Sequence, residues 1–364
     1  MRALILGAGA VGSYVGGRLA AAGHAVTFLA RPNAAQVLRT SGLHLKLGNA
    51  SPANTIRRLA AASSPAEALA GAPYDFIVLA VKSFDTAAAL ADLQAATASW
   101  RSTPREVEDA KRTQRGGAGL PPILCLQNGV DNEAEITRAL GADRVIAGIV
   151  TSALSKPAEG EIVVERERGV GVALGHALSA KIVEALMGAG FKVRAYPAAG
   201  PMKWSKLITN LVGNAASAIL DMRVAELMGD RRLFDMEARA LRECLAVMRA
   251  LGYAVVDLPG VPVRGLALVV ERLPRALAQA LLRRGAGAGR GGKPPSLHMD
   301  LINGRPQTEV GWLNGAVARH GAERGVPTPV NQALTDTLEA LVAGQLSRGE
   351  FRRKPDALLR LING

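Results

Sequence analysis

The sequence predicts an α/β N-terminal domain built on a doubly wound parallel sheet, followed by an all-α C-terminal domain. Short apolar runs alternate with helical patterns over about the first 200 residues. A glycine-rich turn directly follows the first apolar run, and from about Pro201 onward the hydrophobic pattern is helical. A chain of 364 residues has the usual length for two domains. We therefore expect domains at residues 1–198 and 199–364.

The strands of the first domain are predicted from compact apolar runs. These runs show no polar alternation, which is typical of strands buried on both faces of a sheet. They are Ala3–Leu6, Ala25–Leu29, Phe76–Val81, Ile123–Leu126 and Val145–Ile149.

Helical patterns separate these runs, so that strand and helix alternate as in a parallel doubly wound sheet. The expected helices are Ala10–Ala22, Pro65–Leu69, Thr86–Leu93 and Glu133–Leu140. Residues 151–197 differ from this pattern. They are expected to form strands at Glu161–Glu165, Val170–Leu174 and Val193–Tyr196, with a helix at Ala180–Met187.

The second domain is predicted to be a helical bundle. Its long periodic segments are Trp204–Leu220, Asp235–Leu251, Gly311–His320 and Asn331–Leu346. Two irregular stretches are interpreted as insertions with little to bury. One is the charged segment 99–119, and the other is a basic, glycine-rich segment at 283–293 (with the glycines at 285–292), which we expect to be a mobile loop.

Composition excludes several classes of protein. A net charge of +13 is typical of proteins that bind nucleic acid. Only 4% of the residues are aromatic, however, so few side chains could stack on nucleic-acid bases. A basic chain also suits a small anionic ligand. Cys125 and Cys244 fit neither a disulfide framework nor a metal site, and no apolar stretch is long enough to cross a membrane. We expect a soluble, cytoplasmic protein that holds no metal and binds neither nucleic acid nor membrane.

A phosphate-binding turn is predicted at Gly7-Ala8-Gly9-Ala10-Val11-Gly12, between the first strand and the first helix. In a GxGxxG turn the first glycine permits a tight turn, and the second lets a pyrophosphate approach the backbone. The third glycine packs helix on strand, and the N-terminus of the helix presents free N–H groups to the phosphates. This context predicts a Rossmann-type dinucleotide-binding domain.

The second strand ends at Leu29-Ala30-Arg31, the position where the residue that reads the ribose is expected. A carboxylate there would hold the 2′-hydroxyl of NAD, whereas Arg31 can pair with a 2′-phosphate. Arg31 therefore predicts NADP(H) as the cofactor. The alternative is an ordinary surface arginine at a strand end.

Two further strand ends are expected to border the nucleotide, because ligands of open α/β sheets lie at the carboxyl ends of the strands. Lys82 follows the third of the five predicted strands, and Gln127 and Asn128 follow the fourth. Asn128-Gly129 is also a turn signal in its own right, and the two interpretations are compatible.

A polar stripe is predicted in the first helix of the second domain. Lys206, Asn210 and Asn214 are spaced four apart, so they would line one face of an otherwise apolar helix. Asparagine is a poor helix former whose amide must find partners, which favours a polar cleft wall. The alternatives are an exposed stripe and a buried hydrogen-bonded seam between helices.

With these motifs in place, the chain resembles the ketopantoate reductase (2-dehydropantoate 2-reductase) family. The family's W-x-K-L-x-x-N-x-x-x-N helix matches the segment from Trp204 through Lys206 and Asn210 to Asn214, and its Q-N-G turn matches Gln127–Gly129. The matching downstream motifs are Pro295–Asp300, Gly304–Val310, Leu313–Gly315 and Gly325–Pro329.

The resemblance implies a role for each matching residue. Lys206 matches the catalytic lysine that protonates the carbonyl oxygen of the substrate. Asn128, Asn210, Asn214 and Ser296 match residues that bind the oxygens of a small anionic 2-keto acid. The cofactor-binding matches are the glycine turn from Gly7 to Gly12, Arg31, Lys82, Asn128, Ala153 and Glu309. The implied reaction is NADPH-dependent reduction of ketopantoate to pantoate, a step of pantothenate and coenzyme A biosynthesis.

Departures from the family pattern leave the substrate open. Gly311 stands where the family commonly has an acidic residue, and Met222-Arg223-Val224 stands where some members place a further asparagine. The spacing from Asp300 to Glu309 is one residue longer than in the commonest pattern. The alternatives are a related reductase of another 2-keto acid and a non-catalytic NADP-binding sensor.

The remaining polar residues carry no further motif. The five histidines form no spaced set with Asp or Cys, so they are interpreted as structural. A homodimer would form through the helical domain, although the sequence leaves the oligomeric state open.

Overall fold

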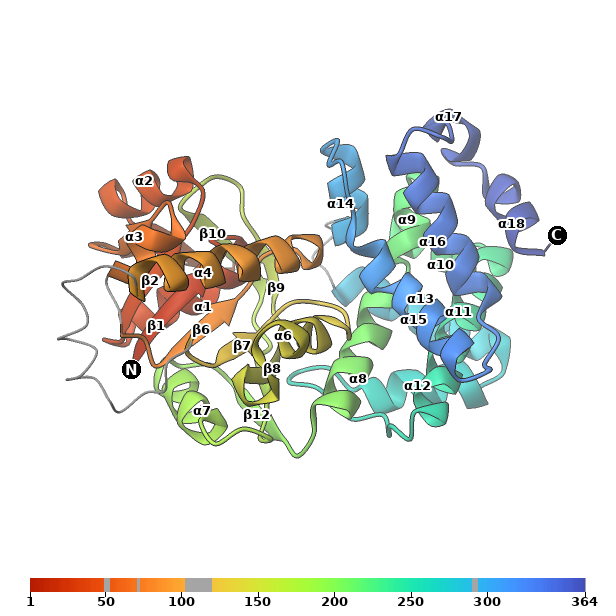
Figure 1. Cartoon of the computed structure of the whole chain (residues 1–364). Coiled ribbons are helices and arrows are strands. Elements are labelled where there is room, and N and C mark those ends of the chain that lie inside the picture. The colour runs from red at the N-terminus through yellow and green to blue at the C-terminus, as the bar shows by residue number, and fades with distance from the viewer. Residues whose placement is uncertain (49–52, 71–72, 102–119, 290–293, 364) are drawn as a thin grey trace. The chain divides into compact units, whose positions relative to one another are not determined.

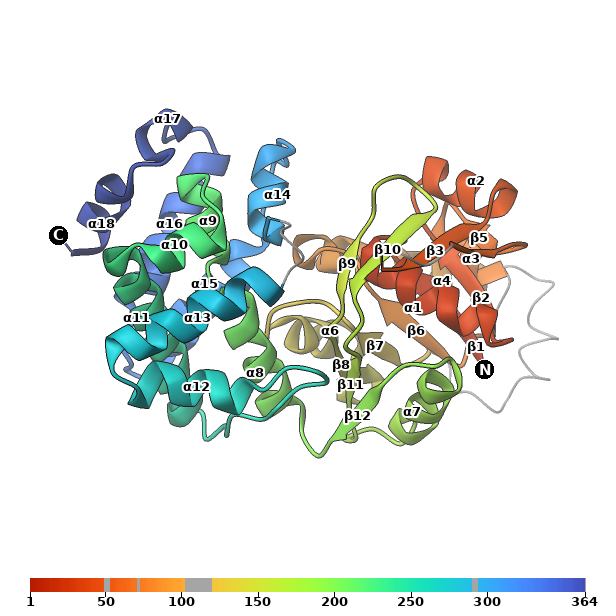
Figure 2. The ribbon, with the colours of Figure 1, turned by 180° about the vertical axis from the view of Figure 1, so that it is seen from behind.

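A computed structural model describes the chain except for residues 49–52, 71–72, 102–119, 290–293 and 364. The chain divides into two compact units (Figures 1 and 2). One comprises Met1–Gln127 with Asn132–Ala199, and the other comprises Asn128–Asp131 with Gly200–Gly364. The four residues Asn128–Asp131, which the predicted boundaries place in the first domain, thus cluster with the second unit. No helix in the described part of the chain combines the length and apolarity that a membrane span requires.

The first unit contains an eight-stranded sheet in the order β12-β11-β8-β7-β6-β1-β2-β5. Six neighbouring strands, from β8 to β5, are parallel, and they have the strand order of a dinucleotide-binding fold. The strands are β1 (Arg2–Leu6), β2 (Ala25–Leu29), β5 (Ala60–Ala62), β6 (Phe76–Leu79), β7 (Ile123–Cys125), β8 (Val145–Val150), β11 (Val170–Ala173) and β12 (Val193–Tyr196).

A smaller sheet has the order β4-β3-β10-β9. Its strands are β3 (Leu43–Leu47), β4 (Asn54–Ile56), β9 (Ala153–Ser155) and β10 (Glu161–Arg166). The helices of the unit are α1 (Ala10–Ala21), α2 (Pro32–Thr40), α3 (Pro65–Ala70), η1 (Ser83–Asp85), α4 (Thr86–Arg101), α6 (Asn132–Leu140), η2 (Ala142–Arg144) and α7 (Ser179–Gly188). The doubly wound sheet is confirmed, while α2, β3, β4 and β5 were not predicted.

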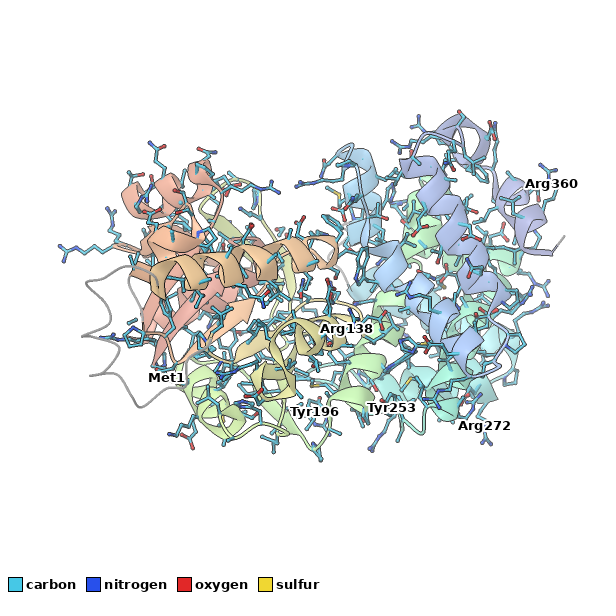
Figure 3. The ribbon with its side chains drawn as sticks, viewed as in Figure 1. Met1, Arg138, Tyr196, Tyr253, Arg272 and Arg360 are labelled. Atoms are coloured by element: carbon cyan, nitrogen blue, oxygen red, sulfur yellow. The ribbon has the colours of Figure 1, made fainter. Side chains whose placement is uncertain are left out.

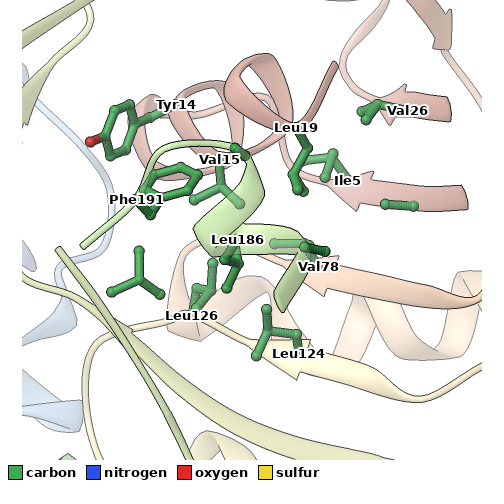
Figure 4. Close-up of a cluster of buried hydrophobic side chains, with 14 of the residues drawn as sticks. Ile5, Tyr14, Val15, Leu19, Val26, Val78, Leu124, Leu126, Leu186 and Phe191 are labelled. Carbon is green, nitrogen blue, oxygen red and sulfur yellow. The ribbon is translucent and has the colours of Figure 1, made fainter. Parts of the chain in front are cut away.

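Both faces of the large sheet are covered, which explains the absence of polar alternation in its strands. On β1, Ala3 and Ile5 pack with residues of α1 and α7, whereas Leu4 and Leu6 pack with residues of α3, α4 and α6. Figure 4 shows Leu19 of α1 beside Ile5, and Tyr14 and Val15 of the same helix near Phe191.

The strand register brings the predicted cofactor residues to one edge of the sheet. Leu6 pairs with Leu29 of β2 and with Leu79 of β6, and Leu79 pairs with Cys125 of β7. The chain segments that follow these strands therefore leave the sheet at the same edge. This is the edge at which nucleotides bind in doubly wound folds.

The second unit is helical, as predicted. Its helices are α8 (Ala199–Leu211, which begins one residue before the unit), α9 (Asn214–Leu220), α10 (Val224–Gly229), α11 (Arg231–Ala250), α12 (Val263–Arg272), α13 (Arg275–Gly289), α14 (Ser296–Ile302), η3 (Glu309–Trp312), α15 (Asn314–Glu323), α16 (Pro329–Val342), α17 (Arg348–Phe351) and α18 (Pro355–Asn363). The segment after α11 packs on α8. The ring of Tyr253 (labelled in Figure 3) lies where a side chain on Gly200 would project, and Val256 donates its N–H to Ser205.

The single helix predicted over Trp204–Leu220 is wrong, because it is broken between α8 and α9. Gly213 adopts φ +61°, a left-handed conformation that ends the helical run. The buried carboxylate of Glu237 accepts the Gly213 N–H at 2.8 Å and stabilises the break. Asn214 is thus the first residue of a new helix.

The two predicted insertions are described only in part. The segment 99–119 begins as the end of α4, and its residues 102–119 lie outside the described chain. The mobile loop predicted at 283–293 is wrong up to residue 289, since α13 continues through Gly289. Residues 290–293 lie outside the described chain.

Candidate active site

The glycine turn of the first unit has the geometry of a phosphate cradle. Gly7 adopts φ +103° and donates its N–H to Leu29 at 3.1 Å, which joins the turn to the end of β2. A Cβ on Gly12 would lie 1.9 Å from the Gly7 carbonyl oxygen, so the turn and α1 are in direct contact there. These two glycines are required by the fold itself.

Gly9 is different, because the fold leaves space beside it. Its φ is −73°, which any residue adopts, and an added Cβ would meet only the Ala80 carbonyl oxygen at 3.8 Å. Gly9 is also the N-cap of α1 and supplies no side-chain cap to the first turn. The space and the helix N-terminus fit a pyrophosphate group.

Arg31 and Lys82 each follow a strand that ends at this edge. Arg31 is exposed and serves as the N-cap of α2 after β2. Lys82 is half-buried and is the N-cap of η1 after β6. Gln127, in contrast, turns into the protein and donates to the Val81 carbonyl at 3.1 Å and to the Thr86 hydroxyl at 2.8 Å. The side chain of Gln127 thus joins the segments that follow β6, and its place beside the nucleotide stays a prediction.

Ala153 begins β9, whose turn to β10 reaches the glycine turn. Lys156 in this turn donates from Nζ to the Ala8 carbonyl oxygen at 2.8 Å and pairs with Glu159 at 2.5 Å. Lys156 was not predicted, because a lone lysine between two short strands carries no motif.

The second unit brings together two of the predicted substrate residues beside Lys206. Asn210, one turn after Lys206 on α8, donates from Nδ2 to Oδ1 of Asn128 at 3.1 Å. Lys206, Asn210 and Asn128 are all half-buried, whereas Trp204, Ser205 and the apolar residues around them on α8 are buried. An accessible polar face on a buried helix is what the predicted cleft wall requires.

Asn214 and Ser296 form a second pair. Asn214 is buried, and its Nδ2 lies 3.5 Å from the Ser296 hydroxyl oxygen, while its Oδ1 accepts the Leu297 N–H at 3.2 Å. The amide thus joins α9 to the first turn of α14. This arrangement is the buried, hydrogen-bonded seam between helices that was one alternative for the polar stripe. Ser296 itself is exposed.

His298 makes two further contacts between α14 and the end of α9. Its Nδ1 lies 2.9 Å from the Ser217 hydroxyl and its Nε2 lies 2.9 Å from the Asp221 carboxylate. The hydrogen bond from His298 lowers the pKa of Asp221 below its usual range, against the opposing effect of burial. The sequence shows no spaced set for this histidine because Asp221 lies 77 residues away, and its contacts fit the structural interpretation.

Glu309 begins η3 and is buried. It lies on a different element from the two amide pairs, next to Thr308, whose hydroxyl caps η3. Among the described residues no group of His, Cys, Asp and Glu could hold a metal ion. Cys125 and Cys244 are buried free thiols, and burial raises the pKa of Cys244.

Comparison with known proteins finds relatives along nearly the whole chain. A 2-dehydropantoate 2-reductase of Halobacterium salinarum is 28% identical over 348 residues, which cover 92% of this chain and 97% of the relative. A protein of the same name from Archaeoglobus fulgidus is 25% identical over 351 residues, covering 94% of this chain and 98% of that protein.

Solved structures share the fold. A ketopantoate reductase of the PanE/ApbA family from Ralstonia eutropha superposes with a TM-score of 0.75 at 27% identity, covering 95% of this chain and 99% of that one. A D-mandelate dehydrogenase with bound NADH and anilino(oxo)acetate has a TM-score of 0.72 at 21% identity, covering 94% of this chain and 99% of that one, a level that establishes the fold alone.

Two family models match in succession. The ketopantoate reductase PanE/ApbA model matches residues 3–176, and the model of the C-terminal part of the same family matches residues 200–342. The chain is thus an oxidoreductase that belongs to the ketopantoate reductase PanE/ApbA family.

Proposed function

We propose that the protein reduces ketopantoate to pantoate with NADPH, and so serves pantothenate and coenzyme A biosynthesis. The main support for the proposal is the hydrogen bond between Asn210 and Asn128, because Asn210 lies one helical turn after Lys206 on α8. Two amides and an ammonium group suit a 2-keto acid, because its carboxylate accepts hydrogen bonds and its carbonyl oxygen must accept a proton.

The cofactor site is proposed on the glycine turn. The space beside Gly9 accommodates the pyrophosphate, and the N-terminus of α1 supplies N–H groups to it. Arg31 pairs with the 2′-phosphate of NADP(H), and Lys82 adds a second positive charge near the adenosine end. When bound, NADPH supplies the hydride that C2 of the keto acid receives.

Lys206 is proposed as the proton donor. As C2 accepts the hydride, its carbonyl oxygen becomes negatively charged, and the ammonium of Lys206 both stabilises that charge and gives up a proton to it. The resulting hydroxyl belongs to the 2-hydroxy acid product, and the neutral lysine takes a proton back from water. Asn128, Asn210 and Ser296 hold the oxygens of the substrate, and the buried amide of Asn214, which contacts Ser296 and Leu297, positions Ser296.

The test is steady-state consumption of NADPH with a panel of keto acids. Ketopantoate is compared with pyruvate, 2-ketoisovalerate, oxaloacetate and phenylglyoxylate, each with NADPH and with NADH. The proposal expects kcat/KM to be highest for ketopantoate with NADPH. A higher value for another keto acid would favour the related-reductase alternative, and binding of NADPH without turnover of any keto acid would favour the sensor.

A further inference from the structure

His320 lies between two elements that carry candidate site residues, the loop of Asn128 and helix α8. His320 on α15 binds Oδ1 of Asp131 through Nε2 at 2.7 Å, and Asp131 stands three residues after Asn128. Its ring also packs edge-on against Trp204 with centroids 5.4 Å apart, and Trp204 precedes Lys206 by two residues on α8.

The neighbouring Arg319 extends the same connection. Its guanidinium binds Oδ2 of Asp131 at 2.6 Å and the Gly311 carbonyl oxygen at 2.8 Å. Gly311 lies in η3, the element that begins with Glu309. Two adjacent residues of α15 thus contact the loop of Asn128, the helix of Lys206 and the 3₁₀ turn of Glu309 (α15 and α8 are labelled in Figure 1).

The carboxylates around His320 favour its charged form. Nε2 faces the Asp131 carboxylate at 2.7 Å and Nδ1 faces the Glu323 carboxylate at 3.3 Å. The contact with Asp131 is a hydrogen bond, and the contact with Glu323 is an ion pair of the exposed Glu323 side chain. A carboxylate at each ring nitrogen favours the imidazolium form.

The surrounding charges favour this form. The hydrogen bond to Asp131 raises the pKa of His320 above its usual 6.5, while burial and the charge of Arg319 oppose the rise. Burial alone would raise the pKa of Asp131, but hydrogen bonds from His320 and Arg319 outweigh it and lower that pKa. On the helices packed against α15, Glu339 of α16 acts on Arg319, and Glu243 of α11 accepts the N–H groups of Val330 and Asn331.

We propose that His320 is a positioning residue that, with Arg319, holds Asp131 and thereby fixes the loop that presents Asn128 to the carboxylate of the keto acid. The inference rests on the proposed function, because it assigns Asn128 to the substrate. It adds a pH dependence to substrate binding. We call the contacts of His320 and Arg319 with Asp131 the clamp. Because the pKa of His320 is raised, its charged contact with Asp131 is complete below about pH 6.5, and this charged contact is lost as the pH rises through the pKa of His320 in the folded protein.

The test compares His320→Gln and Asp131→Asn with the wild-type protein, using His176→Gln as a matched control. His176 contacts the backbone carbonyl of Asp143 in the first unit. The KM for the keto acid, kcat and the Kd for NADPH are measured from pH 6 to pH 9. NMR titration of the His320 ring reports its protonation without any turnover.

The expected results differ between the variants. In the wild-type protein the KM for the keto acid rises as His320 loses its proton. His320→Gln raises that KM about three- to tenfold at pH 6, because a partly exposed charge-assisted contact is lost, and its KM stays constant across the range in which the wild-type KM rises. Asp131→Asn lowers the pKa of His320 in the NMR titration and also raises the KM. The Kd for NADPH stays within about twofold in both variants, and His176→Gln behaves as wild type.

The outcomes separate this inference from the proposed function. A His320→Gln protein whose KM for the keto acid follows the wild-type pH curve overturns the inference. The inference is also overturned if the substitution raises the KM for the keto acid and the Kd for NADPH by the same factor. A wild-type protein that reduces none of the keto acids overturns the proposed function instead.

Discussion

Lys206 and Lys203 lie less than one turn apart on α8, yet their surroundings differ. Lys203 is 4% exposed, whereas Lys206 is half-buried beside Asn210. A buried lysine contributes to folding through its polar contacts, whereas a partly accessible one can reach a ligand. Residues three apart share a face of a helix, so spacing alone would allow either lysine as the proton donor, and burial distinguishes them.

Replacing Lys206 by alanine is expected to lower kcat about 10²- to 10⁴-fold, the usual effect of removing a positioned acid. The Kd for NADPH should stay nearly constant, because the lysine is proposed to serve the keto acid. Lys203→Ala is the matched comparison and should lower the melting temperature while leaving turnover within a few-fold of normal. The reverse ranking of the two variants in kcat would contradict the role proposed for Lys206.

Cofactor preference is expected to depend on Arg31. Arg31→Ala should weaken NADPH binding about ten- to a hundredfold and leave NADH binding almost unchanged, because only NADPH carries the 2′-phosphate. Fluorescence titration with both cofactors measures the effect, and Arg138→Ala on the exposed face of α6 is the control. If Arg31→Ala keeps the full preference for NADPH, the phosphate is bound elsewhere.

At the scale of elements, the turn between β1 and α1 combines two kinds of glycine. Gly12 is required for α1 to pack against the Gly7 carbonyl, whereas Gly9 meets no protein atom closer than 3.8 Å. The fold therefore explains Gly12, and a ligand explains Gly9.

This difference predicts opposite results for two alanine variants. Gly9→Ala should keep the wild-type melting temperature but lose affinity for NADPH, because its Cβ would occupy space that the pyrophosphate needs. Gly12→Ala should lower the melting temperature, since its Cβ would lie 1.9 Å from a backbone oxygen. Gly9→Val should abolish NADPH binding in a folded protein. Unchanged NADPH affinity in Gly9→Val would contradict the Rossmann-type cofactor site.

The break between α8 and α9 gives a further prediction at this scale. Gly213→Ala should lower the free energy of unfolding by about 1–2 kcal/mol, the cost of a left-handed conformation for a residue with a Cβ. The added Cβ would also lie 2.7 Å from the Val224 side chain. Urea unfolding measures the loss, and Gly252→Ala is the control, because Gly252 has φ +74° but no atom within 4 Å of its Cβ position. If Gly213→Ala lowers the free energy of unfolding no more than Gly252→Ala does, the Val224 side chain accommodates the added Cβ without destabilising the protein.

At the scale of the whole molecule, carboxylates that hold the C-terminal segment make stability sensitive to acid. Glu226 of α10 accepts from Arg353 at 2.9 Å and from the Arg223 N–H at 2.8 Å, and these hydrogen bonds lower its pKa from 4.5 to about 2. Asp221 pairs in the same way with His298 and with Arg352 of the same segment.

A group with a lowered pKa stabilises the folded state above its ordinary pKa, and that contribution is lost as the pH falls through the folded-state value. The free energy of unfolding should therefore decrease between pH 4.5 and about pH 2. Glu226→Gln should be less stable than wild type at pH 6 and should show a smaller decrease below pH 4.5. Urea unfolding at several pH values measures this, with Glu184→Gln on the exposed face of α7 as the control. Equal pH dependence in the wild-type protein and Glu226→Gln would contradict the prediction.

The sequence by itself determined the features that arise from neighbouring residues. The order of strands and helices, the glycine turn and the Lys206–Asn210 spacing all follow from periodicity or from conformational limits within a few residues. The strand Leu43–Leu47 was missed although its burial alternates, and Ala60–Ala62 was missed because three alanines carry no strand preference.

The contacts between residues far apart in the sequence became known only from the folded chain. Glu237 stabilises the break at Gly213 from 24 residues away, Asn214 reaches Ser296 across 82 residues, and His320 binds Asp131 across 189 residues. Such contacts have no period in the sequence, because they depend on how separate elements pack rather than on the conformation of any one of them. The pairing of Asn128 with Asn210, and the clamp that His320 forms on its loop, therefore required the folded chain.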